Sequence, residues 1–193
     1  MLKLLIGIIL ILLNYSINIG NIHIELIPDF LGYIVLYMGL KELKGYSVYF
    51  QKNQKYAIVM VIFSGVLYVV SFVSYLADIA YELNTTIIIV SFIYVTMMLY
   101  IIFNMIKGFL DMERQNNVSL KGSSLMLCLK GNVISLLGMC IFSLLGSWMG
   151  YPAIIEMIAF SLNFIFGLLR FVLIAAMART YYYYKKVDYG KII

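Results

Sequence analysis

Charged residues are scarce in this sequence, and their scarcity excludes an ordinary soluble protein. Only 12% of the 193 residues are charged, whereas 64% are hydrophobic. Soluble domains carry about 25% charged and about 45–50% apolar residues. So little polar material cannot cover a soluble protein of this size, and the composition therefore predicts a polytopic membrane protein. The net charge of +5 does not indicate nucleic-acid binding, because the basic residues lie at the ends of apolar stretches.

Histidine and cysteine are rare as well, which limits metal and acid–base chemistry. The chain has one histidine, His23, and two cysteines, Cys128 and Cys140. On one helix these cysteines would lie about 18 Å apart, which is too far for a disulfide. The sequence also lacks the H-E-x-x-H, G-x-S-x-G and phosphate-binding glycine motifs. We therefore expect no enzyme activity, no metal and no cofactor, and we interpret His23, Glu25 and Asp29 as a solvated outer rim.

Linkers rich in proline, glycine or serine are absent, so no composition change divides the chain into domains. Apolar stretches of about 20 residues, the length that crosses the hydrocarbon core, recur along the sequence instead. The first stretch lacks the small-residue cleavage pattern of a signal peptide, and we expect it to be retained. We predict an all-α fold with one integral membrane domain, residues 1–193, and six transmembrane helices at about 4–20, 28–44, 56–76, 85–106, 125–148 and 153–177.

The distribution of basic residues predicts the orientation of these helices. Lysine and arginine occur near both termini and in two predicted loops, 41–55 and 107–124. The loops on the other side have no basic residue, and one of them carries Asp78 and Glu82. Because cytoplasmic loops are enriched in Lys and Arg, both termini are predicted to be cytoplasmic.

Residues 21–40 carry the most unusual pattern in the chain. Apolar and polar residues alternate over 22–26, and a period of two predicts extended backbone at the outer interface or in the mouth of the bundle. Pro28 suits the first turn of a helix, and Asp29 favours the positive end of its dipole. A spacing of four predicts one polar stripe on this helix, formed by Asp29, Tyr33, Tyr37 and Lys41.

The stretch IELIPDFLGY, residues 24–33, resembles a motif of small multi-pass membrane proteins of low-GC Gram-positive bacteria. The family pattern is similar to I-D-L-L-P-D-F-I-G-Y after a short first span, and this chain departs from it at Glu25 and Ile27. The resemblance covers about the first 45 residues. It implies a helical bundle in a bacterial cell membrane, and it supplies no catalytic residue.

Polar residues inside the predicted spans form a candidate site. A spacing of seven places Glu156, Asn163 and Arg170 on one face of the last span. A charge at membrane depth costs about 2.5–3.5 kcal/mol and has to face protein or water. Alternatively, Arg170 and Lys130 extend to the cytoplasmic headgroups, and Asn163 only joins helices. The candidate polar cavity would be lined by Asn14, Asp29, Tyr33, Tyr37, Lys130, Glu156, Asn163 and Arg170.

Three functions are compatible with these patterns. The first is an integral membrane protein that binds or passes a small solute. The second is the substrate-binding membrane subunit of an ATPase-driven vitamin transporter, although the Ala-x-x-x-Ala pattern of that family is missing from the first helix. The third is a scaffold or regulator that acts through helix contacts, for which small residues such as Gly131 and Ser135 are suited. The expected partners are the lipid bilayer and another membrane protein or a second copy, and not nucleic acid.

Overall fold

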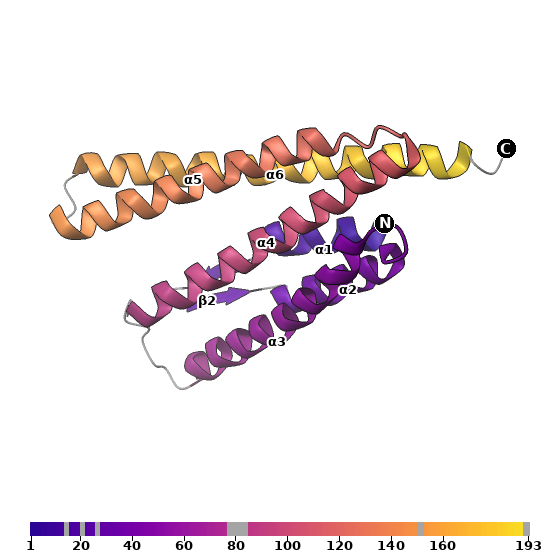
Figure 1. The fold of residues 1–193 in the computed structure, drawn as a ribbon. Coiled ribbons are helices and arrows are strands. Elements are labelled where there is room, and N and C mark those ends of the chain that lie inside the picture. Colours follow the sequence, from indigo (N-terminus) through magenta and orange to yellow (C-terminus); the bar gives the residue numbers. More distant parts are fainter. Residues whose placement is uncertain (14–15, 20–21, 26–27, 77–84, 150–152, 191–193) are drawn as a thin grey trace. The chain divides into compact units, whose positions relative to one another are not determined.

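The computed structural model describes residues 1–13, 16–19, 22–25, 28–76, 85–149 and 153–190. Helices dominate these ranges, which confirms the predicted helical fold (Figure 1). A short two-stranded hairpin is the only other regular element that they contain. The elements in chain order are α1 Leu2–Leu13, β1 Ser16–Ile19, β2 Ile22–Glu25, α2 Asp29–Leu43, α3 Val48–Leu76, α4 Thr85–Asn116, α5 Gly122–Met149 and α6 Ala153–Gly190.

Four of the helices in the described ranges, α3 to α6, are long and apolar enough to cross a membrane. Their apolar stretches of 21 to 27 residues exceed the roughly 20 residues that the hydrocarbon core requires. The structure is therefore compatible with a multi-pass membrane protein. The number of six spans and the cytoplasmic position of the termini stay predictions.

The first predicted helix, 4–20, is wrong in its second half. Helix α1 ends at Leu13, and residues 16–19 form the strand β1. The 12 residues of α1 make a helix of about 18 Å, which is shorter than the hydrocarbon core of about 30 Å. Asn14 lies outside the described residues.

Polar and apolar residues already alternate in 16–19, earlier than predicted, and this stretch forms the strand β1. β1 pairs antiparallel with β2, so that Ser16 lies opposite Glu25 and Asn18 lies opposite His23. Isoleucine positions lie opposite each other in between. Since successive strand positions alternate between faces, one face of the hairpin has polar positions and the other has isoleucines. The predicted extended backbone of 22–26 is confirmed for β2.

Two predicted polar loops, 41–55 and 107–124, are mostly helical. Helix α3 already begins at Val48, and α4 continues to Asn116. The reason is composition, because Lys, Gln, Glu, Arg and Met are good helix formers and extend a helix beyond its apolar part. Helix α4 ends where Asn117 takes a left-handed backbone with φ 50°, a conformation common just after helices.

The chain forms two compact units, Met1–Val118 and Ser119–Ile193, and each is described by itself. In the first unit α1 packs on α2, α2 on α3 and α3 on α4, whereas the second unit consists of the pair α5 and α6. Many large apolar side chains remain exposed, among them Ile62, Val66, Val69 and Val73 along α3. Such a face suits contact with lipid. The prediction of one integral membrane domain says that the whole chain inserts into the bilayer. It does not concern the division into compact units, and it stays a prediction.

Helices α1 and α2 approach each other so closely that their backbones touch. A Cβ atom on Gly7 would lie 2.6 Å from the backbone nitrogen of Leu36. A Cβ atom on Gly39 would meet the Leu4 backbone nitrogen and lie 2.7 Å from the Leu4 Cα. Only glycine fits at such contacts, and small residues are a common means of close helix packing in membranes.

Polar contacts join α3 to α4. The Ser47 hydroxyl accepts a hydrogen bond from the Tyr49 N–H at the start of α3 and donates one of 2.6 Å to Asp111 of α4. Deeper in the pair, the Asn53 side-chain amide donates a 2.8 Å hydrogen bond to the Ile101 carbonyl oxygen. These contacts set the antiparallel register of the two long helices.

Candidate functional site

A buried carboxylate lies at the start of α2. Pro28 is the residue just before the helix, with φ −62° and ψ 133°, and its carbonyl accepts a hydrogen bond from the Leu31 N–H. Asp29 is therefore the first helical residue, where the helix dipole favours a negative charge. Asp29 is only 9% exposed, so its interpretation as part of a solvated rim is wrong, and the Tyr94 hydroxyl of α4 donates a hydrogen bond to its Oδ2 atom.

Aromatic rings from three helices contact one another, and Tyr94 joins them to this carboxylate. Tyr33, one turn after Asp29 on α2, is fully buried, and its ring meets the Tyr94 ring edge-on with centroids 6.3 Å apart. Phe63 of α3 stacks on the Tyr94 ring, with the two centroids 6.2 Å apart. The arrangement combines one negative charge, phenol hydroxyls and ring faces. We call Asp29, Tyr33, Phe63 and Tyr94 the Asp29 cluster.

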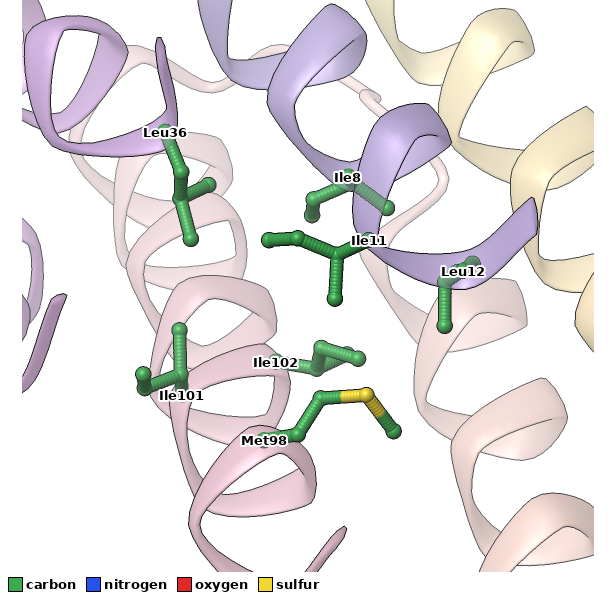
Figure 2. A pocket seen from close by; sticks show the side chains of 7 residues that line it. All are labelled: Ile8, Ile11, Leu12, Leu36, Met98, Ile101 and Ile102. Carbon is green, nitrogen blue, oxygen red and sulfur yellow. The ribbon is translucent and has the colours of Figure 1, made fainter. Parts of the chain in front are cut away.

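A small apolar pocket lies about two turns after Asp29, at Leu36 of α2 (Figure 2). Its volume is only about 10 Å³, and it is partly open. Figure 2 shows the side chains of α1, α2 and α4 that converge on it. They are Ile8, Ile11, Leu12, Leu36, Met98, Ile101 and Ile102. No residue of the predicted polar cavity is among them.

The predicted polar stripe of α2 divides into two parts in the structure. Asp29 and Tyr33 come together in the Asp29 cluster. Tyr37 is half-buried one turn further on, and Lys41 is exposed near the end of the helix. The stripe thus passes from a buried site to the helix surface.

The other predicted cavity residues belong to the second unit. Lys130 is exposed on α5. Arg170 is half-buried on α6, with its guanidinium carbon 4.5 Å from the centroid of the Phe166 ring. Glu156 and Asn163 lie on the same helix, but their side chains are outside the described part. A cavity shared by all eight predicted residues stays a prediction.

Sequence reasoning missed Tyr94, which is the hydrogen-bond partner of Asp29. Tyr94 lies within an apolar, β-branched stretch of α4, and a tyrosine in such a stretch has a polar tip that requires a partner when buried. That requirement was a usable signal for a buried polar partner. It could not show that Tyr94 in particular pairs with Asp29, because the chain has 17 tyrosines.

No protein-family model, no curated protein and no solved structure matches this chain. The chemistry of the Asp29 cluster therefore has to come from its own residues. A buried carboxylate beside ring faces is suited to hold a positively charged group, since anionic oxygen and π-electrons both attract cations.

Proposed function

We propose that this protein is a multi-pass protein of a bacterial cell membrane that binds a small organic cation at the Asp29 cluster. The membrane, the six spans and the cytoplasmic termini come from the sequence prediction and from the resemblance of residues 24–33 to the Gram-positive family. The class of solute comes from the side chains around Asp29.

The burial of Asp29 among aromatic rings is the observation that carries the proposal. An ionisable residue within a membrane bundle is costly, and function is the usual reason for its presence. The carboxylate of Asp29 supplies the charge that neutralises an ammonium group. The Tyr94 ring, whose hydroxyl is bonded to Asp29, supplies π-electrons, which attract ammonium groups in the same way.

The nearby apolar pocket is too small for an aliphatic tail, because its volume of about 10 Å³ is close to that needed by a single water. Leu36, which lines the pocket, follows Asp29 by seven residues and thus lies about 10.5 Å further along the α2 axis. A cation at Asp29 is therefore held through its ammonium group, and not by burial of a tail in this pocket.

Isothermal titration calorimetry on the detergent-solubilised protein tests this proposal with n-butylammonium as the probe. We expect binding to the wild type and a loss of about tenfold or more in affinity for Asp29→Asn, because contacts to a charged group are worth about 1.5–3 kcal/mol. The neutral alcohol n-butanol, which has the same chain, should bind more weakly than n-butylammonium.

Asp111→Asn is the matched control, because Asp111 is also a carboxylate that accepts a hydroxyl hydrogen bond in the first unit. It should bind n-butylammonium as the wild type does. Equal affinity of the wild type and Asp29→Asn for n-butylammonium would contradict the proposal. So would equal affinity of the wild type for n-butanol and n-butylammonium.

A scaffold or regulator is the second candidate, and the backbone contact between α1 and α2 favours it. In that case the hydrogen bond from Tyr94 to Asp29 only joins α4 to α2. Asp29→Asn would then lower the unfolding temperature, and n-butylammonium would change the unfolding temperature of neither protein. The calorimetric experiment therefore separates the two candidates.

A further inference from the structure

A band of lysine and aromatic side chains follows the seam between α3 and α4. Spacings of three and four residues place its members on one face of each helix. We call this group the α3–α4 band. It consists of Tyr49, Lys52 and Tyr56 on α3 and of Tyr100, Phe103 and Lys107 on α4.

Contacts across the seam hold the band together. The ring centroids of Tyr56 and Tyr100 are 5.0 Å apart, with the ring planes at 80°. At the other end, the Lys107 Nζ atom lies 4.4 Å from the centroid of Phe103 and 5.7 Å from that of Tyr49. Lys52 is exposed and lies between Tyr49 and Tyr56 on the same face of α3. The two ammonium groups therefore belong to one patch.

The patch keeps its positive charge. Among the residues that the structure describes, no carboxylate forms an ion pair with Lys52 or Lys107. Asp111, one turn after Lys107, accepts the 2.6 Å hydrogen bond from Ser47 at the start of α3, and its single negative charge offsets only one of the two lysines. The band is thus arranged to attract an anion.

Beyond the tyrosines, the same two faces become apolar and exposed. Val59 follows Tyr56 by three residues and is 48% exposed, and Ile93 precedes Tyr100 by seven residues and is 45% exposed. Lysines, then phenols, then aliphatic side chains follow one another along the seam. This order matches the phosphate, the glycerol esters and the acyl chains of a phospholipid.

We infer that the α3–α4 band binds the headgroup of an anionic phospholipid, with Lys52 and Lys107 at the phosphate and the hydroxyls of Tyr56 and Tyr100 at the ester oxygens. Basic residues at the membrane surface recognise anionic lipids in this way. The predicted orientation places the band in the cytoplasmic leaflet. The inference goes beyond the Asp29 cluster and requires only that α3 and α4 lie in a bilayer.

Native mass spectrometry of the detergent-solubilised full chain tests it, with phosphatidylglycerol and phosphatidylcholine as the two probes. We expect one phosphatidylglycerol to bind more tightly than phosphatidylcholine. Each lysine near the surface changes the affinity roughly fivefold, so the double variant Lys52→Gln/Lys107→Gln should bind phosphatidylglycerol about 25-fold more weakly. The double variant Lys41→Gln/Lys44→Gln loses the same charge at exposed positions near the end of α2 and should bind like the wild type.

Two further variants keep the test decisive. Tyr56→Phe/Tyr100→Phe retains every charge and should weaken phosphatidylglycerol binding by a smaller factor. Lys52→Gln alone changes an exposed residue and leaves packing intact, so it replaces the double variant if that variant loses its helical circular dichroism. Equal losses in the 52/107 and 41/44 variants would overturn the inference. Equal binding of phosphatidylcholine, or binding of inorganic phosphate as tight as that of the lipid, would overturn it as well.

Discussion

The antiparallel pairs α1–α2 and α5–α6 are held together by different means. In the first pair the backbones touch, since a Cβ atom on Gly7 or Gly39 would collide with backbone atoms of the partner helix. In the second pair leucine side chains separate the backbones, and a Cβ atom on Gly138 would lie an ordinary 3.5 Å from the Leu162 Cδ1. Here Asn132 donates a 3.3 Å hydrogen bond to the Leu169 carbonyl oxygen instead.

The difference shows two ways of joining helices without a hydrophobic driving force. Lipid tails are as apolar as leucine, so association in a membrane relies on close packing and on hydrogen bonds between helices. The α1–α2 pair uses packing, and it should be sensitive to added atoms. The α5–α6 pair uses side-chain hydrogen bonds, and it should be sensitive to the loss of polar atoms.

The largest effect is expected from Gly39→Ala. The new methyl group collides with the Leu4 backbone, which cannot move aside as a side chain can, and overpacking of this kind costs about 1–3 kcal/mol. Thermal unfolding in detergent, followed by far-ultraviolet circular dichroism, should show a lower transition temperature for the first unit. Gly138→Ala is the control, and its gain in helix propensity of up to about 1 kcal/mol should leave the protein equally or more stable. Equal destabilisation by both substitutions would remove the distinction between the two pairs.

A smaller effect is expected from Asn132→Leu, which keeps the number and branching of the side-chain heavy atoms and removes the hydrogen bonds to Leu169 and Cys128. Such bonds in membrane proteins are worth about 0.6 kcal/mol and at most about 1.7 kcal/mol. The only tryptophan, Trp148, lies on α5, so its fluorescence should report the earlier unfolding of this pair. Asn116→Leu removes an amide that bonds only within α4 and should leave the fluorescence transition unchanged. A fluorescence transition unaltered by Asn132→Leu would mean that leucine packing alone holds α5 to α6.

The smallest effect is expected from Lys3→Gln. Lys3 forms a 2.5 Å ion pair with Glu42, which links the start of α1 to the end of α2, but both side chains are about half exposed. Exposed pairs contribute at most about 1 kcal/mol and are screened by salt. The loss of stability should therefore be small at low salt and vanish at high salt. A loss as large as that from Gly39→Ala would show that charge, and not the glycine contact, joins the first pair.

The helices could be predicted from the sequence because apolar stretches and local signals mark them. Pro28 and Asp29 indicated where α2 begins, and the structure places its start at Asp29. The end of α1 could not be found from hydrophobicity, since isoleucines continue through β1. Polar and apolar residues alternate within 16–19 and again within 22–25, and Gly20 and Asn21 stand between the two stretches. This pattern is typical of a hairpin and would have indicated that α1 ends before residue 16.

The contacts of the candidate site were harder to predict, because they depend on which helices are neighbours. Asp29 and Tyr33 could be singled out from their spacing on α2. Tyr94 could not be assigned to them, as nothing local distinguishes it from the tyrosines of the α3–α4 band. Likewise Gly32 and Gly39 share a face at a spacing of seven, but their role becomes visible only when α1 lies against them. The transporter-subunit hypothesis stays a prediction.

The short lengths of α1 and α2 have a consequence for the surrounding lipid. With 12 and 15 residues, these helices cover only about 18 and 22 Å of a hydrocarbon layer about 30 Å thick. Their neighbours α3 and α4 have 29 and 32 residues. If α1 and α2 cross the bilayer as predicted, the lipid on the two sides of the first unit meets two different hydrophobic thicknesses, and thinning next to α1 and α2 is one way to accommodate the shorter pair. This protein would then locally deform the membrane in which it resides.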